Sequence, residues 1–194
     1  MSALLSLQQD ARSRNPRRLA ALLLCALALG GCDRLFNRNA AALPAIADVR
    51  ASYDKSGVTN AEIDYDGTVI VMRVRQPPAQ LQRGGSLWAK VGPYIYLFNP
   101  ATQRIMDANP RITAVRVITL GTRGREVARA TLPAGALNEL TWLRTLNLLG
   151  HAVNEGTARP VTLEDLVRWG EQYTRFRYNP DFVPEAAGRS RENP

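Results

Sequence analysis

The stretch that decides the fold is residues 61–75, which read AEIDYDGTVIVMRVR. Apolar and polar side chains alternate on both sides of Asp66-Gly67, a dipeptide typical of two-residue hairpin loops because it tolerates positive φ. With that dipeptide as the loop, Tyr65 pairs with Thr68. We therefore predict a β-hairpin whose apolar face consists of Ile63, Tyr65, Ile70, Met72 and Val74.

Downstream of this hairpin, the sequence predicts a short helix and a second hairpin. Pro77-Pro78 ends the second strand, because proline cannot donate to a strand ladder. Residues 86–98 are too apolar for a loop, but Gly92-Pro93 is expected to break or kink a helix there. Asn99-Pro100 is typical of a helix start and predicts a helix over 100–108. Strands over 112–120 and 126–132 then flank a turn at 121–124.

The rest of the chain is expected to be helical. A helix over 136–153 has leucines near one stripe, joined by Trp142. A second helix opens at 162–165 with a capping-box-like start. The leucines of the stripe are Leu137, Leu140, Leu143, Leu146 and Leu149.

These elements give the order β-β-α-β-β-α-α. We predict an α+β fold, an antiparallel sheet of two hairpins with helices packed on one face. The sequence predicts one domain over 47–183 and a disordered tail over 184–194.

The N-terminal segment has the pattern of an export signal. Residues 1–18 end in the basic cluster RSRNPRR, and the apolar run LAALLLCALAL follows at 19–29. A basic stretch, a short apolar stretch and small residues at the end are typical of a secretory signal. A permanent membrane-spanning helix needs about 20 apolar residues, so this run is too short.

Leu29-Gly30-Gly31-Cys32 resembles the lipobox of bacterial lipoproteins. The resemblance implies lipid attachment to the Cys32 sulfur and cleavage between Gly31 and Cys32. Residues 1–31 are then a signal peptide, and 32–46 are an acylated N-terminus and tether. It also implies attachment to the bacterial cell membrane; Asp33 favours the periplasmic face of the inner membrane, with the outer membrane as the alternative.

Charge and cysteine content argue against nucleic-acid binding and against sites that need a free thiol. Without residues 1–31 the chain has 21 basic and 16 acidic residues, a net charge of +5. Such a charge at a membrane surface favours anionic headgroups. The basic residues are scattered and form no recognised motif, so nucleic acid is not expected as a partner. Cys25 leaves with the signal and Cys32 carries lipid, which leaves no thiol for a disulfide, a metal or catalysis.

The catalytic inventory predicts that the protein is not an enzyme and has no cofactor or metal. His151 is the only histidine, so a multi-histidine metal site is impossible. The sequence has no G-x-S-x-G elbow, and Asp64-Tyr65-Asp66-Gly67 lacks the remaining ligands of a calcium loop. One alternative stays open, a hydrolase with a dispersed carboxylate site, for which the candidates are Asp64, Asp66, Glu139 and Glu171.

Two binding hypotheses remain. The leading one is a binding or scaffolding module for an envelope component, such as a protein partner, that uses the sheet or the helical pair. The alternative is a lipid- or anionic-ligand-binding module that uses arginines such as Arg73, Arg75 and Arg116. Tyr94 and Tyr96, beside Gly92-Pro93, are candidates to line a groove.

Overall fold

A five-stranded sheet forms the centre of residues 42–182, which are the residues that the computed structural model describes. The strands lie in the sheet in their sequence order, from β1 to β5. The expected signal peptide, Cys32 and the expected tail lie outside the described residues. The elements in chain order are α3 (Ile46–Asp54), β1 (Ala61–Asp66), β2 (Val69–Arg75), α4 (Pro78–Leu97), α5 (Pro100–Ala108), β3 (Ala114–Leu120), β4 (Glu126–Pro133), α6 (Glu139–Glu155), α7 (Pro160–Tyr173) and β5 (Arg175–Tyr178).

The α+β class is confirmed, but the sheet is mixed rather than antiparallel throughout. β2 and β3 pair in parallel, whereas the other three neighbouring pairs are antiparallel. Both predicted hairpins form. The long crossover through α4 and α5 brings the chain back to the end of the sheet where β2 begins, so β3 must run parallel to β2. The predicted element order also lacked α3, α4 and β5.

The first hairpin has the predicted faces but a different register. Tyr65 pairs with Ile70 and Asp66 with Val69, so the loop is Gly67-Thr68 rather than Asp66-Gly67. Gly67 has a φ of 60°, the left-handed conformation that a two-residue hairpin loop requires. Because the partner of each residue moves by two positions, every side chain stays on the face predicted for it.

The expected tether ends earlier than predicted, because its last residues belong to the folded domain. Leu43 and Ile46 pack against the core. The Pro44 carbonyl accepts a hydrogen bond of 2.8 Å from the Tyr65 hydroxyl. α3 then buries Val49 and Tyr53.

α4 continues through Pro93, so of the break or kink predicted at Gly92-Pro93 the break is wrong. A proline inside a helix costs about 3 kcal/mol, since it removes a hydrogen bond and crowds the preceding turn. α4 lies on β3 and β4 and also contacts α7. This burial, which includes Val91, Tyr94 and Leu97, offsets the cost.

α6 faces the core with only part of the predicted leucine stripe. It starts at Glu139, after Asn138, whose side-chain oxygen accepts a 2.9 Å hydrogen bond from the Thr141 amide. Its buried residues are Trp142, Thr145 and Ala152. Leu140 and Leu143 are 77% and 69% exposed. The predicted stripe is therefore wrong at Leu140 and Leu143, whereas Leu137 and Trp142 are buried as expected and Leu149 packs against the core.

The predicted capping box of α7 is also absent. α7 begins at Pro160, and Arg159 before it makes no side-chain cap. The Thr162 hydroxyl donates instead to the Arg159 carbonyl at 2.8 Å.

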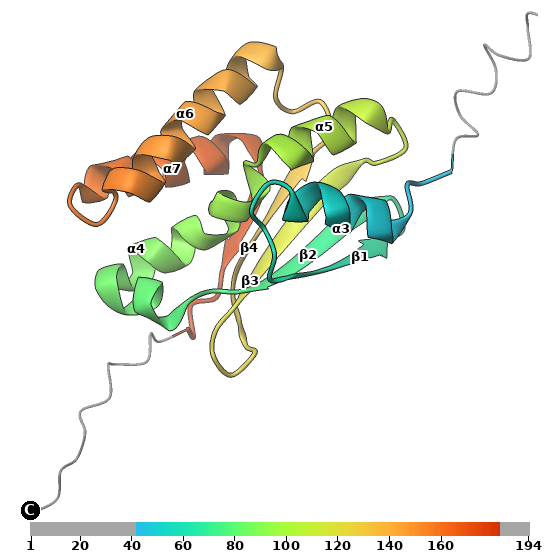
Figure 1. Cartoon of the computed structure of the whole chain (residues 1–194). Coiled ribbons are helices and arrows are strands. Elements are labelled where there is room, and N and C mark those ends of the chain that lie inside the picture. Colours follow the sequence, from blue (N-terminus) through green and yellow to red (C-terminus); the bar gives the residue numbers. More distant parts are fainter. Residues whose placement is uncertain (1–41, 183–194) are drawn as a thin grey trace, which may run out of the picture. The chain divides into compact units, whose positions relative to one another are not determined.

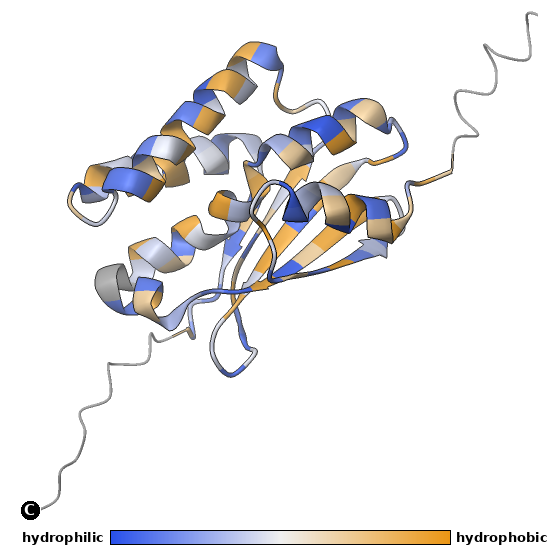
Figure 2. Ribbon diagram, in the orientation of Figure 1, coloured by the Kyte–Doolittle hydropathy of each residue, from blue (hydrophilic) through white to orange (hydrophobic). Residues whose placement is uncertain are grey.

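The main hydrophobic core lies between the sheet and the helices, all of which cover the same face of the sheet (Figure 1), and Leu81, Ala89 and Val127 form a small second cluster. Figure 2 shows hydrophobic residues concentrated on the central strands. Both sides of this core come from residues 42–182, so the described part of the chain has a core of its own. Its largest fully buried side chains include Tyr53, Tyr94, Phe98, Ile70, Met72 and Leu97.

Candidate functional site

The sheet has a second face that no helix of the described residues covers, and we call it the open face (Figure 1). Its members follow from alternation along the strands and from the pairing registers. From β1 to β5 they are Glu62, Asp64 and Asp66; Val69, Val71, Arg73 and Arg75; Ala114, Arg116, Ile118 and Leu120; Glu126, Arg129, Thr131 and Pro133; Arg175 and Arg177.

Arginine is the commonest residue on the open face. One row across the sheet runs from Arg73 through Ile118 to Arg129 and Arg177. The row covers three strand spacings, about 14 Å. A neighbouring row places Arg116, Thr131 and Arg175 side by side. With Arg75, the face carries six guanidinium groups.

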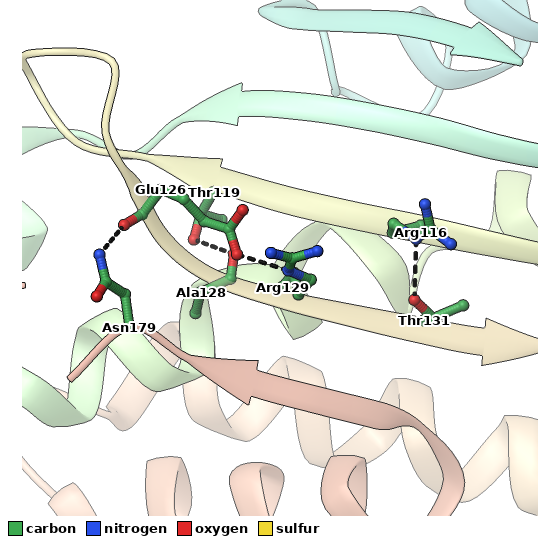
Figure 3. A network of polar contacts seen from close by, with 7 residues as sticks. All are labelled: Arg116, Thr119, Glu126, Ala128, Arg129, Thr131 and Asn179. Carbon is green, nitrogen blue, oxygen red and sulfur yellow. Dashed lines mark hydrogen bonds and ion pairs between the residues drawn. The ribbon is translucent and has the colours of Figure 1, made fainter. Parts of the chain in front are cut away.

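Three of these arginines have partners within the protein. Arg116 donates to the Asp66 carboxylate at 3.1 Å and to the Thr131 hydroxyl at 3.3 Å. Arg129 pairs with Glu126 at 2.6 Å. Arg75 donates to the Thr122 carbonyl at 3.3 Å. Figure 3 shows the contacts of Arg116 with Thr131 and of Arg129 with Glu126.

Arg73, Arg175 and Arg177 differ from the other three. All are exposed, and within residues 42–182 their guanidinium groups make no hydrogen bond or ion pair. Each guanidinium has five N–H donors in a planar fork that matches carboxylate and phosphate oxygens. Their hydrogen-bonding capacity is therefore directed to solvent or to a ligand.

Charge is unevenly distributed over the open face. β1, at one edge, contributes three carboxylates: Glu62, Asp64 and Asp66. From β2 to β5 the face contributes six arginines and a single carboxylate, that of Glu126. The face is therefore acidic at the β1 edge and basic over the remaining strands.

The β4–β5 side of the open face is hollowed. A hollow of about 520 Å³ is lined by Glu126, Arg129, Arg177, Tyr178, Asn179 and Pro180. The Asn179 side chain donates to the Glu126 carbonyl at 2.8 Å (Figure 3). The Asn179 backbone N–H donates to the Val127 carbonyl at 2.9 Å. These two bonds hold the end of β5 against β4.

The expected tyrosine groove is not formed by Tyr94, which is fully buried. Its ring stacks on Phe98 and Phe176, with centroids 5.4 Å away in each case. Burial raises the pKa of the Tyr94 hydroxyl, which lies 3.5 Å from the Thr174 hydroxyl. Tyr96 is half-buried against the same core, and burial raises its pKa too. Tyr94 is a core residue.

The four candidate carboxylates of a dispersed hydrolytic site do not come together. Asp64 and Asp66 project from β1 on the open face. Glu139 and Glu171 belong to α6 and α7, on the opposite side of the sheet.

His151, the only histidine of the sequence, lies on the helical side of the sheet. His151 is exposed on α6, and its Nδ1 lies 3.2 Å from the Glu155 carboxylate. This hydrogen bond is the main reason that the pKa of Glu155 is lowered. Within residues 42–182, no cluster of three or more histidine, cysteine or acidic side chains could hold a metal ion.

Comparison of the chain with protein-family models, curated proteins and solved structures gives no match. None of the helices within residues 42–182 is long and apolar enough to cross a membrane. The candidate site therefore rests on geometry and charge.

Sequence reasoning named half of the arginines on the open face. Arg73, Arg75 and Arg116 were the suggested anion ligands, and the structure places them on one face. Arg129, Arg175 and Arg177 were missed. The period-two pattern of Arg175-Phe-Arg-Tyr178 was the available signal, since it is typical of a strand with one basic face.

A second hollow, of about 610 Å³, lies between α6 and α7 on the other side of the molecule. The Arg144 guanidinium lies 4.4 Å from the centre of the Trp169 ring, and exposed Leu140 lines the rim. Exposed apolar side chains next to an arginine–tryptophan pair are common at protein interfaces.

Proposed function

We propose that this chain is a bacterial lipoprotein, anchored in the cell membrane through acylated Cys32. Its folded part is a non-enzymatic binding module, and the open face is its binding surface for anionic groups. The anchor is supported by the lipobox-like residues at 29–32 and by the basic and apolar segments before them. The periplasmic face of the inner membrane is the favoured location, and the outer membrane is the alternative.

One observation carries the binding role: three exposed arginines without partners share an uncovered sheet face with three more arginines. Like charges placed across from each other in a sheet are destabilising, and Arg129 lies directly opposite Arg177. A charged edge strand also protects a sheet from unwanted pairing, which accounts for basic residues on β5. It does not account for Arg73 on β2, which has a strand on each side and lies opposite Glu62 of β1 without forming an ion pair with it.

The anchor is tested by fractionating cells that produce the protein or its Cys32→Ser variant. We expect the unaltered protein in the membrane fraction with an acylated N-terminus, and the variant without acyl chains. An unmodified native chain that still begins with Met1 would contradict the proposal.

Anion binding is tested by titrating the chain from residue 33 onward with inorganic phosphate. The readout is the NMR signals of the arginine side-chain N–H groups. We expect the signals of Arg73, Arg175 and Arg177 to shift, and those of Arg116, held by Asp66, to shift less. Chloride at the same ionic strength is the control. Equal responses to the two anions would count against a phosphate-binding face.

A second candidate function is protein binding at the α6–α7 hollow, favoured by the exposure of Leu140 and Leu143. Crosslinking of the anchored protein in cells, with and without Leu140→Lys and Leu143→Lys, tests it. Loss of a stoichiometric protein partner in this variant, but not in open-face variants, would make the helical pair the binding surface.

A further inference from the structure

We infer that the anionic groups bound by the open face are lipid phosphates of the membrane that holds the anchor, so that the domain lies with this face against the bilayer. The inference rests on the proposed function and names its ligand. It follows from the shape of the face, its charge and the length of the tether.

The shape of the face fits a layer of phosphates better than a single small anion. The guanidinium groups come from four adjacent strands and extend across about 14 Å of sheet. Converging side chains of an enclosed pocket would suit one phosphate. Arginines spread over a broad surface suit phosphates that lie side by side, as they do in a bilayer.

Apolar side chains lie among the arginines. Ile118 lies between Arg73 and Arg129 in the same row, and Leu120 lies beside Arg75. Both are half-buried, so part of each remains accessible on the open face. Apolar groups flanked by arginines are favourable at the headgroup region, where the arginine stems add apolar contact while their charges stay with the phosphates.

The tether keeps the folded domain, and so the open face, within reach of the bilayer. Nine residues lie between Cys32 and Ala42, the first described residue, so ten peptide units join the two. Even fully extended, they span at most about 35 Å. A short connection makes binding intramolecular, with an effective concentration in the millimolar range, so weak contacts with lipid are sufficient.

The uneven charge also predicts which part of the face approaches the lipid. Glu62 and Asp64 on β1 are repelled by an anionic surface, whereas Asp66 is neutralised by Arg116. Arg73, Arg175 and Arg177 are attracted without losing an internal partner. The domain should therefore tilt, with β5 closer to the membrane than β1.

Flotation of vesicles tests the inference, using the chain from residue 33 onward, which lacks the acylated cysteine and keeps the folded domain with its own core. We expect the protein to float with vesicles of phosphatidylcholine and phosphatidylglycerol, and not with phosphatidylcholine alone. Binding should weaken as ionic strength rises from about 0.01 M to about 0.15 M, where the Debye length falls from about 30 Å to about 8 Å.

The decisive variant carries Arg73→Gln, Arg175→Gln and Arg177→Gln together. Each arginine near an anionic surface contributes about fivefold to binding, so the triple variant should bind about a hundredfold more weakly. The matched control removes the same charge from the helices, with Arg50→Gln, Arg104→Gln and Arg168→Gln. All six residues are exposed, and urea unfolding verifies that both variants fold.

Failure of the inference is distinguishable from failure of the proposed function. Equal loss of vesicle binding in the two triple variants would mean that net charge alone acts, which overturns the inference. Response to inorganic phosphate without vesicle binding would overturn the lipid assignment and leave the proposed anion-binding role of the open face intact. Absence of both responses would overturn the inference together with the proposed anion-binding role of the open face.

Discussion

Gly170 on α7 packs directly against the ring of Tyr94, and a Cβ at this position would overlap the ring. Tyr94 has no room to move, because Phe98 and Phe176 stack on it. We expect Gly170→Ala to lower the free energy of unfolding by about 1–3 kcal/mol, the usual cost of overpacking a core. Urea denaturation measures this change in the free energy of unfolding.

Gly150→Ala is the matched control for this substitution. Gly150 lies in α6, and a Cβ there would meet no atom within 4 Å. Alanine is the better helix former, so this variant should be more stable by up to about 1 kcal/mol. Changes of the same sign and size at the two glycines would contradict the packing of α7 on Tyr94.

Tyr53 makes the stability of the domain sensitive to alkaline pH. Burial raises its pKa to about 12, from an ordinary value of 10.0. The folded state therefore disfavours the tyrosinate, and this contribution to stability is present below pH 10 and lost as pH rises toward 12. Two pKa units correspond to roughly 3 kcal/mol. Urea unfolding at a series of pH values from 8 to 12 tests this.

The Tyr53→Phe variant separates Tyr53 from the other tyrosines. It should be less stable at pH 8 by about 1–3 kcal/mol, because the buried Thr102 hydroxyl loses its 2.9 Å hydrogen-bond partner. Between pH 10 and 12 it should lose less stability than the unaltered chain, although Tyr94 still contributes. Parallel pH profiles for the two proteins would show that Tyr53 does not cause the dependence.

At the scale of elements, α6 shows how a leucine pattern misleads. Leu140 and Leu143 fit a helical stripe, yet Trp142 and Thr145 face the core, and the Trp169 indole donates to the Thr145 hydroxyl at 2.7 Å. We expect Trp142→Ala to cost about 3–5 kcal/mol, the usual range for a buried aromatic residue. Leu143→Ala should change stability by no more than about 0.5 kcal/mol.

Urea denaturation of these two variants determines which face of α6 packs on the sheet. Both substitutions truncate a large apolar side chain to alanine, so helix propensity changes little between them. A larger loss of unfolding free energy for Leu143→Ala than for Trp142→Ala would show that the leucine face of α6, and not the Trp142 face, packs on the core.

Patterns within short stretches of sequence correctly predicted the helix cap at Asn99 and the two hairpins. Asn99 was expected to cap a helix, and its side chain accepts from the Ala101 amide at 2.8 Å. Alternation gave both hairpins and the correct face of the first. The register of the first hairpin was predicted wrongly, because a shift of the pairing by two residues leaves every side chain on the same face. Alternation therefore determines the face but not the register.

Features that depend on distant parts of the chain were not predictable in the same way. α4 continues through Pro93 only because the sheet and α7 pack against it. The parallel pairing of β2 with β3 joins segments about 45 residues apart in the sequence. The open face follows from that pairing, since Arg73 and Arg129 share a row only when β2 and β3 are neighbours.

At the scale of the whole molecule, the chain contains one arrangement twice. A nine-residue helix precedes a hairpin in α3–β1–β2 and again in α5–β3–β4. The parallel contact of β2 with β3 joins the two hairpins, and the buried Tyr53–Thr102 hydrogen bond joins α3 to α5. α4, α6, α7 and β5 lie outside the two units.

β5 completes the sheet and the candidate site together. Phe176 points to the core and stacks on Tyr94, while Arg175 and Arg177 lie on the open face. A chain ending at Thr174 loses this stacking and leaves the ladder groups of Ala128–Thr131 unpaired on β4. We expect it to be less stable and to self-associate through the new edge, because an unpaired edge is a template for strand addition.

The comparison for this truncation is a chain ending at Phe182, which retains every residue that the structure describes. Light scattering after gel filtration measures the mass, and urea denaturation measures the stability. A full-length chain with Arg175→Gln and Arg177→Gln tests the two roles of β5 separately, since it keeps the strand and removes its charge. It should retain the mass and stability of the unaltered chain but bind anionic vesicles more weakly. If the chain ending at Thr174 matches the one ending at Phe182 in mass and stability, then β5 is not part of the sheet, and the open face loses two of its arginines.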